Sequence, residues 1–539
     1  PTRTDLGSRA SPTESSMLDP PLSHHRHCAS VSPRFSAAHI CIFPSTVQLF
    51  VLGVIAFLAI GATSPSSLLV AERSSVRHPV VVVGPLIGQT LQVNDARWLN
   101  PCSPWTPTWT TAWLNLDKLA AGCALHSSHA QLGLTFDPTT HRTKSPEHVQ
   151  VRVAEGWAGL TVFGYEVYGN LTQRLESEGF VRDVDILPMG YDWRLSVADW
   201  EQEAFPRFFR TISDAVSKNG QPVVLTGVSM AAPFTHAFLR WANAQRGGKS
   251  WVKKNVHAFV PVGGPFNGAV NALSALVGGM AFAYTPPGQP GAAKFTCPLC
   301  DPPMAEQVSE EHFVIKAVDG FGAVLKELLM DWLLTDFTRL AREFPSSYWM
   351  SPGVDDSIPD RSYVTLQHGP WAQPEEIKAS GLPSLFRRLL MHDEAEHMKY
   401  ALSVGTIEDP GVPTHCIYSH NVRTFSHLTF PAGGAFAEIG ASVEIGDGDG
   451  TVHSDSLSVC ERWKSTVKVY KLPGVPHEGM MTVGQVHDVI VGVAKDDAAL
   501  DAWTSPAFVD LDVPRDGMTN ATILDEWQAN LVVALNEDA

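Results

Sequence analysis

The segment Pro222–Pro233, PVVLTGVSMAAP, decides the fold. A short apolar run, Pro222–Thr226, leads through the pentapeptide GVSMA, centred on Ser229, into a helical pattern that begins near Phe234. A strand, a sharp turn and a helix in this order are the setting of a nucleophile elbow, where small residues flank the serine because the strained turn brings backbones close together. The alternative is a plain strand, turn and helix whose serine only caps the helix.

Strand-like and helical segments alternate along the rest of the chain. The run VVVV at 80–83 is typical of a strand that is buried on both faces of a parallel sheet. Further strand signals lie at Ala258–Val262 and Val467–Leu472, and helical patterns lie at Leu171–Glu178 and Phe234–Gln245. This alternation predicts an α/β fold with a mostly parallel sheet flanked by helices on both faces.

The bulk composition argues against one class of partner. Of the 539 residues, 44% are apolar and 18% are charged, so a sizeable buried core is available. The net charge of −17, without any run of Lys and Arg, argues against nucleic acid, because binding to phosphates needs a basic face. A membrane stays open as a partner, since the insertion of apolar side chains needs no net positive charge.

The N-terminal part differs in composition from the remainder. Residues 1–46 are rich in Ser, Pro and His and show no apolar periodicity, which predicts disorder. Within residues 47–64, the uncharged run Val47–Ala62 predicts a signal peptide or a signal anchor, with a buried core helix as the alternative. Either signal would send the main domain, expected over residues 76–535, into the lumen of the secretory pathway.

A serine nucleophile needs a base to take its proton and an acid to hold that base. In α/β-hydrolases the chain order is Ser, then Asp or Glu, then His. Here Asp449, in the loop DGDG, and His477 follow strand-like segments in that order, so we predict an α/β-hydrolase with Ser229, Asp449 and His477 as its catalytic residues. His453 and His487 are the fallback bases. A calcium loop is the alternative for DGDG, although no Glu closes it at the twelfth position.

The negative charge that develops on an attacked carbonyl needs backbone donors. The residue after the nucleophile supplies the first donor, here the N–H of Met230. The second donor comes from the loop after the first core strand, Gly84–Leu91, in which we predict the N–H of Ile87. A plain β-turn is the alternative for that loop.

Several segments also match motifs of one known family. They are HPVVVV at 78–83, the tryptophan-rich stretch between Cys102 and Cys123, Gly190-Tyr-Asp-Trp-Arg194, Gly263–Ala269, and Asp449-Gly-Thr-Val452 with Cys416 before it and Cys460 after it. Together they resemble the lecithin:cholesterol acyltransferase family over roughly residues 76 to 495. The chain departs from the family pattern at Val228, where His is usual, at Ala231, where Gly is usual, and at Gly84-Pro85, where the order Pro-Gly is usual.

The resemblance implies an α/β-hydrolase fold with a membrane-binding insertion over residues 102–123 and a cap or lid region over about 270–345. It implies no cofactor and no metal for the reaction. It implies the following groups: Ser229, Asp449 and His477 as the triad, Met230 and Ile87 as oxyanion donors, and the disulfides Cys102–Cys123 and Cys416–Cys460.

Three local features keep two interpretations each. Trp105, Trp109 and Trp113 suit an interfacial surface, since indoles favour the boundary between headgroups and acyl chains, and they suit a protein core equally well. Gly278–Asp301, rich in Pro and small residues, is long for a plain loop and is a candidate lid. Cys297-Pro-Leu-Cys300 indicates a local disulfide or two free thiols.

We therefore expect acyl transfer from a phospholipid ester to a sterol, a diacylglycerol or water, at a membrane or lipoprotein surface. The alternatives are a lipid-binding pseudoenzyme, motivated by Val228 and Ala231, and an esterase of small soluble esters. The expected location is the secretory lumen, with the protein anchored in the endoplasmic reticulum membrane, secreted or lysosomal. There, the glycosylation patterns at Asn170 and Asn520 would be usable. The oligomeric state is left open.

Overall fold

The computed structural model describes residues 77–95, 109–113, 130–162, 165–278, 340–357, 361–368, 372–388, 391–430 and 442–505. All of them belong to one compact unit, Ser74–Ala539. The segments expected to be disordered (1–46) and to carry a signal (47–64) lie outside the described residues. Within the described residues, no helix is both long enough and apolar enough to cross a bilayer.

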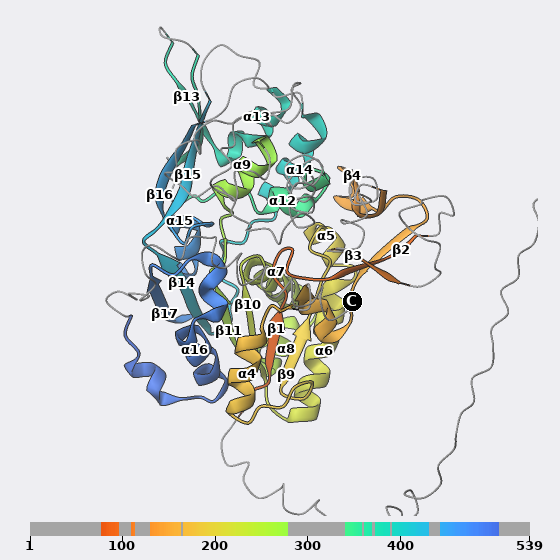
Figure 1. The fold of residues 1–539 in the computed structure, drawn as a ribbon, viewed down its shortest axis with the longest axis vertical. Helices are drawn as coiled ribbons and strands as arrows, with labels where there is room; N and C mark the ends of the chain where they lie inside the picture. Colours follow the sequence, from red (N-terminus) through yellow and green to blue (C-terminus); the bar gives the residue numbers. More distant parts are fainter. Residues whose placement is uncertain are drawn as a thin grey trace, which may run out of the picture. The chain divides into compact units, whose positions relative to one another are not determined.

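A six-stranded sheet forms the centre of the unit (Figure 1). All of its neighbouring strands pair in parallel. Every residue of the VVVV strand and of the strand before Ser229 is buried, as a parallel sheet covered on both faces requires. In spatial order the strands are β17 (Thr466–Pro473), β14 (Thr414–His420), β11 (Val256–Val262), β10 (Val223–Val228), β1 (Val80–Val83) and β9 (Ile186–Met189).

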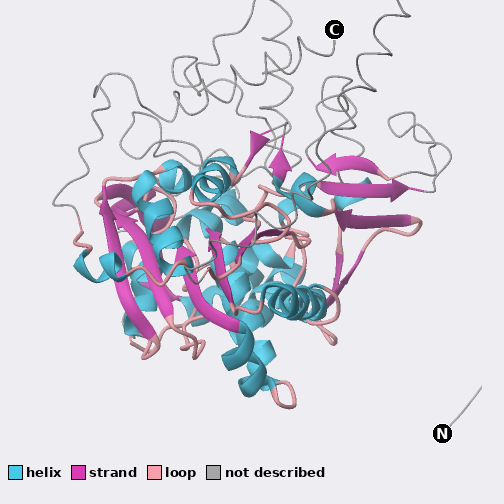
Figure 2. Cartoon of the chain, turned by 90° about the horizontal axis from the view of Figure 1, so that it is seen from below, coloured by secondary structure: helices cyan, strands magenta, loops and turns pink. Residues whose placement is uncertain are grey.

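Helices cover both faces of this sheet (Figure 2). Successive side chains of a strand point to opposite faces, so Val80 and Val82 pack on one side and Val81 and Val83 on the other. The first side carries α4 (Gly169–Ser177) and α16 (Gly484–Ala494); the second carries α6 (Ala204–Asn219), α7 (Ala231–Ala244) and α8 (Gly248–Asn255). This arrangement confirms the predicted α/β-hydrolase fold.

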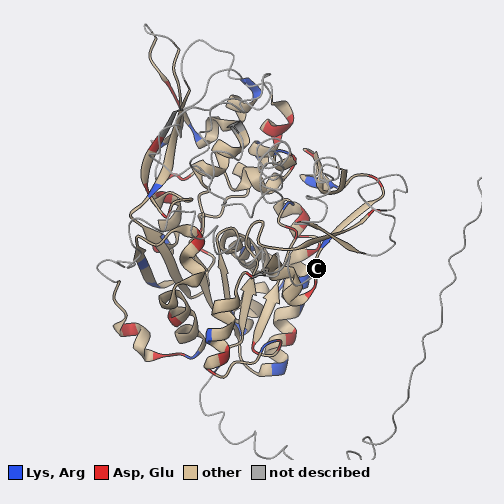
Figure 3. Cartoon of the chain, viewed as in Figure 1, with Lys and Arg blue, Asp and Glu red and all other residues tan. Residues whose placement is uncertain are grey.

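The charged residues lie mainly on the outer helices and loops of the described ribbon (Figure 3). The central strands β1, β10 and β11 carry no Lys, Arg, Asp or Glu. In the view of Figure 3, Lys and Arg are interspersed with Asp and Glu and do not gather on one element.

A second, smaller sheet has its own hydrophobic core. Its strands are, in order, β13 (Glu375–Lys378), β12 (Ser362–Leu366), β15 (Val422–Phe430) and β16 (Ser442–Gly448). The helices whose residues share this core are α9 (Val270–Gly278), α12 (Pro345–Trp349), α13 (Leu382–Arg388) and α14 (His392–Ser403). Most of the expected cap or lid region, including the candidate lid 279–301, lies outside the described residues. The second core continues past residue 345, through α13, α14 and β15.

A sharp bend takes the chain from the main sheet into the second sheet. Asn421 separates β14 from β15 and has a left-handed backbone, with φ 66°. Its N–H donates to a carboxylate oxygen of Asp447 at 2.6 Å, near the end of β16. The bend therefore brings the loop after β16 back to the main sheet, and this loop carries Asp449.

Three smaller sheets complete the described fold. One contains β3 (Thr110–Trp113), β2 (Leu91–Asp95) and β6 (Val149–Val153). The other two are pairs of antiparallel strands, β4 (Thr135–Asp137) with β5 (Arg142–Lys144) and β7 (Thr161–Val162) with β8 (Tyr165–Glu166). The remaining short elements are η2 (Gly156–Leu160), α5 (Val197–Trp200), η5 (Ala379–Gly381), α15 (Ser454–Leu457), η6 (Ser458–Arg462), η7 (His477–Thr482) and η8 (Ala498–Ala502).

Candidate active site

Ser229 lies in a strained turn between β10 and α7. Its backbone is left-handed, with φ 58°, a conformation that costs a non-glycine residue about 1–2 kcal/mol. Two backbone hydrogen bonds hold the turn: the N–H of Ser229 donates to the carbonyl of Val262 and the N–H of Ala232 donates to the carbonyl of Ser229, each at 3.0 Å. The serine is partly exposed while the rest of β10 is buried, as a nucleophile elbow requires.

The small residues on either side of the serine have a steric reason. A methyl group at Gly227 would lie 2.6 Å from the Cβ of Ala231. Ala231 itself is fully buried at the start of α7. One methyl group therefore fits between these positions but two would clash, so the alanine that departs from the family pattern is compatible with the elbow.

His477 and Asp449 form a buried pair. Nδ1 of His477 lies 2.6 Å from Oδ2 of Asp449, and the backbone N–H of His477 donates to the Asp449 carbonyl at 2.7 Å. The other carboxylate oxygen accepts the N–H groups of Thr451 and Val452. Because an ionised carboxylate only accepts, Nδ1 carries the proton and leaves a lone pair on Nε2. That Nε2 is buried and has no hydrogen-bond partner among the described residues.

The pKa of His477 reflects two opposing effects. Burial lowers the pKa, but the charge of Asp449 and the hydrogen bond to it raise it, and the result lies above the ordinary value of 6.5. The imidazole is thus a stronger base than an isolated histidine, although it lies in the protein interior.

The pair lies beside the elbow because both contact the end of β11. Val262 accepts the N–H of Ser229, and a methyl group at the next residue, Gly263, would lie 3.5 Å from Nδ1 of His477. Within the described residues no hydrogen bond joins the Ser229 hydroxyl to His477. Hydrogen bonds of this kind are often loose before substrate binds, so the three-residue assignment stays a prediction.

His453 and His487, the two alternative bases, have different hydrogen-bond partners from His477. Both ring nitrogens of His453 are buried without a partner among the described residues, and burial lowers its pKa to about 3. His487 has its Nε2 2.7 Å from the carbonyl of Met481. Neither imidazole contacts the Asp449 carboxylate, so His477 is the better candidate base.

The calcium interpretation of the DGDG loop has little support in the geometry. The Asp447 carboxylate accepts hydrogen bonds from the backbone of Asn421 and the hydroxyl of Ser454. The Asp449 carboxylate is engaged by His477 and by two backbone N–H groups. Protein donors thus already contact both carboxylates.

The two predicted oxyanion donors have the geometry of available groups. Among the described residues, the backbone N–H groups of Met230 and Ile87 have no hydrogen-bond acceptor. Ile87 also has a left-handed backbone, with φ 52°, which is a genuine outlier for a β-branched residue. The indole of Trp113 donates to the Ile87 carbonyl at 2.9 Å and so helps to hold this conformation.

The sequence did not reveal two buried side chains that support these groups. Gln89 donates to the carbonyls of Gly84 and Pro85 at 3.1 and 3.0 Å and accepts the N–H of Tyr191 at 2.7 Å. Tyr168 donates to the carbonyl of Val83 and accepts the N–H of Val228, the residue before the nucleophile. Neither residue belongs to a recognisable motif, because each acts on backbone groups that are distant in sequence.

The Tyr-Asp-Trp-Arg segment has a structural role. The guanidinium of Arg194 is buried and forms a bidentate ion pair with the Asp192 carboxylate, with N–O distances of 2.9 and 2.6 Å. A third donor of Arg194 reaches the Leu132 carbonyl at 2.6 Å. Through this last contact, Arg194 connects its own segment to the segment that contains Leu132.

The predicted disulfide near the acid loop is present: Cys416 and Cys460 are bonded, with their Cα atoms 6.0 Å apart. It joins β14 to η6, which follows the Asp449 loop. Cys102 and Cys123, as well as Cys297 and Cys300, lie outside the described residues.

The described tryptophans that we expected to contact a membrane differ in how deeply they are buried. Trp113 is only 4% exposed and packs edge-on against Trp193, so it follows the core alternative, and the membrane-binding expectation is corrected for this residue. Trp109 is half-buried, with the guanidinium of Arg152 over its ring at 4.3 Å. Trp105 and most of the 102–123 insertion lie outside the described residues.

Known proteins similar to this chain point to one family. The family model for lecithin:cholesterol acyltransferase matches residues 109–288. Lysosomal phospholipase A and acyltransferase of Canis lupus familiaris is 25% identical over 446 residues, which cover 77% of this chain and 92% of that protein. Phospholipid:diacylglycerol acyltransferase of Saccharomyces cerevisiae is 22% identical over 373 residues, which cover 63% of this chain and 55% of that protein. The family model and these relatives support the resemblance of the chain to the lecithin:cholesterol acyltransferase family.

The similarity to these named enzymes confirms the predicted enzyme class, an acyltransferase or phospholipase. Among solved structures, a chain of the Tle4-Tli4 complex aligns with a TM-score of 0.41 and 13% identity, covering 78% of this chain and 98% of that chain.

Proposed function

We propose that this protein removes an acyl group from a phospholipid through an acyl-enzyme on Ser229. The acyl group then passes to water, a sterol or a diacylglycerol. The observation that carries the proposal is the buried His477–Asp449 pair at 2.6 Å. Nε2 of His477 has no partner among the described residues, and the ring lies next to Gly263, which follows the Val262 carbonyl that holds the strained turn at Ser229.

In the first half-reaction, the Ser229 hydroxyl attacks the carbonyl carbon of the ester and Nε2 of His477 takes its proton. Asp449 holds the ring in the required tautomer and stabilises the imidazolium that forms. The N–H groups of Met230 and Ile87 bind the carbonyl oxygen as it becomes negative. The imidazolium then gives its proton to the departing lysophospholipid oxygen, which leaves the acyl group on Ser229.

In the second half-reaction, the hydroxyl of the acceptor loses its proton to His477 and attacks the acyl-enzyme, and the imidazolium returns the proton to the departing Ser229 oxygen. Hydrolysis and acyl transfer therefore use the same residues and differ only in the acceptor. The two relatives support both outcomes, because one is named a phospholipase and acyltransferase and the other a phospholipid:diacylglycerol acyltransferase.

We also propose that the enzyme works in the lumen of the secretory pathway, at a membrane or lipoprotein surface. The first relative is named as lysosomal. The Cys416–Cys460 disulfide suits an oxidising compartment. Asn170 is exposed on α4, so its side chain is accessible to a glycan.

The test compares two serine variants on phospholipid vesicles with a labelled acyl chain. Ser229→Ala is expected to abolish release of lysophospholipid, while Ser250→Ala, at an exposed position on α8, keeps the wild-type rate. Vesicles that also contain a sterol or a diacylglycerol reveal the acceptor through the labelled ester that forms.

The same assay separates the rival functions. A pseudoenzyme would bind the vesicles without turnover, and wild-type protein would not react with a fluorophosphonate at Ser229. A soluble esterase would cleave a dissolved short-chain ester as fast as a vesicle-borne phospholipid. If Ser229→Ala retains the wild-type rate, the nucleophile assignment is wrong.

A further inference from the structure

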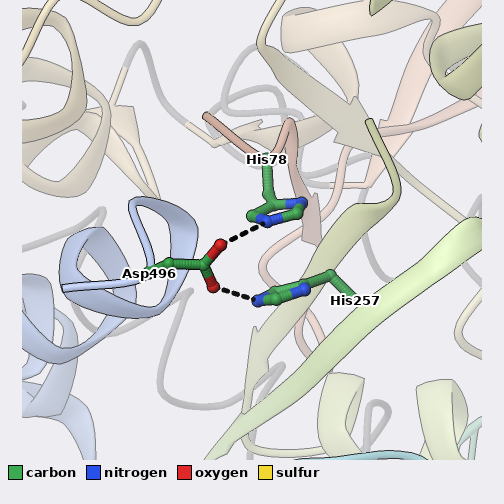
Figure 4. Close-up of side chains that lie close together, drawn as sticks. All are labelled: His78, His257 and Asp496. Atoms are coloured by element: carbon green, nitrogen blue, oxygen red, sulfur yellow. Dashed lines mark hydrogen bonds and ion pairs between the residues drawn. The ribbon is translucent and has the colours of Figure 1, made fainter. Parts of the chain in front are cut away.

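Two histidines and a carboxylate lie close together (Figure 4). They lie near the amino ends of the main sheet's strands, whereas Ser229 follows the carboxyl end of a strand. His78 directly precedes β1, His257 is the second residue of β11, and Asp496 follows the end of α16. All three therefore lie near the amino ends of the parallel strands. Ser229 and His477 follow the carboxyl ends of β10 and β17, so the cluster is separate from the candidate active site.

The carboxylate contacts both imidazole rings. Its Oδ2 lies 3.1 Å from Nε2 of His78 and its Oδ1 lies 3.0 Å from Nε2 of His257. The two rings are stacked, with centroids 3.6 Å apart and planes at 10°, so both Nε2 atoms point at Asp496 (Figure 4). One ligand atom of each residue lies within 4.8 Å of the other two. Solvent reaches the cluster through Asp496, whose side chain is 51% exposed, while that of His78 is 5% exposed.

A count of donors shows that this arrangement needs a positive charge between His78 and Asp496, supplied either by a second proton on His78 or by a metal ion. Nδ1 of His78 lies 2.8 Å from the carbonyl of Pro222, which can only accept, so Nδ1 carries a proton. In a neutral His78 the other nitrogen, Nε2, then presents a lone pair to Asp496 at 3.1 Å. An ionised carboxylate also presents lone pairs, and two acceptors face each other unless a positive ion lies with them.

We propose that His78, His257 and Asp496 bind a divalent transition metal ion of the zinc class. Two imidazole nitrogens and a carboxylate are a ligand set that zinc accepts, at about 2.0–2.2 Å from each atom, with water as the remaining ligand. The Pro222 carbonyl acts as the partner that a metal-bound histidine usually has on its second nitrogen. Because the lone pairs of stacked rings run parallel, the rings must tilt toward the ion when it binds.

The position of the cluster indicates a structural role. The backbone N–H of His78 already donates to the carbonyl of Ala494, the last residue of α16, at 2.8 Å. The ion pairs of Asp496 with His78 and His257 already connect the end of α16 to the segments that carry β1 and β11, and a bound ion would strengthen these connections. Since an ion that binds only the folded chain stabilises it, the site would raise the melting temperature without taking part in acyl transfer. The proposal does not depend on the proposed function.

The experiment measures metal binding in protein that carries His477→Ala, so that the candidate catalytic imidazole cannot hold the ion. The purified, chelator-treated chain is titrated with Zn²⁺ at pH 7.5 in a calorimeter, and the melting temperature is followed in parallel. We expect one ion per chain and a higher melting temperature. Adding Asp496→Asn or His257→Ala should weaken binding about tenfold or more.

A matched control tests for unspecific binding by histidine–carboxylate pairs. Nε2 of His368 lies 3.1 Å from a Glu375 oxygen, the same distance as in the His78–Asp496 pair, but without a second histidine. His368→Ala should therefore leave the affinity unchanged. Co²⁺ in place of Zn²⁺ should give the visible absorption of a metal ion bound to nitrogen ligands, and this absorption should be lost in Asp496→Asn.

Two results would overturn the proposal. One is the absence of saturable Zn²⁺ binding in wild-type and His477→Ala protein, which would mean that a proton on His78 satisfies the cluster. The other is binding that Asp496→Asn and His257→Ala leave intact, which would place the ion elsewhere. The Asn substitution keeps the shape of the exposed side chain, so loss of binding in a variant that still melts cooperatively reports on the ligand and not on folding.

Discussion

The hydroxyl of Tyr168 donates a hydrogen bond to the carbonyl of Val83 at 2.5 Å. The same oxygen accepts the N–H of Val228 at 3.2 Å. It therefore joins β1 and β10 at the point where the two strands end, one before the oxyanion loop and the other before Ser229. A single buried hydroxyl thus fixes the distance between the predicted nucleophile and the loop that carries Ile87.

Replacing this hydroxyl should impair the reaction more than substrate binding. We expect Tyr168→Phe to lower kcat roughly tenfold with little change in KM, because two buried backbone groups lose a partner at a cost of about 1–3 kcal/mol. Steady-state kinetics on phospholipid vesicles measures this. Tyr348→Phe is the control, since its hydroxyl bonds the Arg342 carbonyl within the second core. Equal kcat values in the two variants would contradict the positioning role.

The raised pKa of His477 predicts how activity depends on pH. The imidazole must be neutral to accept a proton, so kcat/KM should fall as the pH drops through a pKa above 6.5. Asp449→Asn removes the charge that raises this pKa and leaves the effect of burial, which lowers it. The midpoint of the profile should then move to lower pH.

Asp449→Asn should also lower kcat by roughly 10³–10⁴-fold, because the ring loses its preferred tautomer. The measurement is a pH–rate profile of both proteins on the same vesicles. A profile whose midpoint is unchanged by the substitution would show that another group titrates.

Gly263 is expected to tolerate no side chain. Its φ is 56°, and a methyl group there would lie 2.3 Å from the terminal carbon of Met480, beside the His477 ring. Gly263→Ala should therefore displace the imidazole and reduce kcat/KM about tenfold or more. Gly220→Ala is the control for backbone strain, since Gly220 has φ 73° and open space around it. If both variants lose the same stability and neither loses activity, the contact with Met480 has no catalytic consequence.

The Cys416–Cys460 disulfide should contribute strongly to stability. The two cysteines are 44 residues apart in sequence, and closing a loop of that length in the unfolded chain corresponds to about 4 kcal/mol in the chain-entropy model. Urea unfolding of Cys416→Ala/Cys460→Ala should show a loss of that order. With a thiol present in both samples, the wild-type protein and the double variant should show the same midpoint. If the double variant unfolds at the same urea concentration as the oxidised wild-type protein, the disulfide does not constrain the unfolded chain.

Strand signals were readable in the sequence where apolar side chains run without interruption. β1, β10, β11 and β17 all overlap segments that the pattern predicted. β9 and β14 were not predicted, because Pro188 interrupts ILPM and polar residues flank the short apolar run CIY in THCIYSH. These two strands form since β1, β11 and β17 offer them backbone partners, and such partners depend on the fold and not on local propensity.

The sequence by itself determined the local chemistry: a serine flanked by small residues between strand and helix, and the order Ser, Asp, His along the chain. The first feature depends on residues close together in sequence and the second only on their order along the chain, so a pattern can contain both. Only the tertiary structure decided that His477, and not His453 or His487, meets Asp449. It also brought Tyr168 to the elbow and joined His78, His257 and Asp496, because contacts between residues 60 to 418 positions apart depend on how the strands and helices pack.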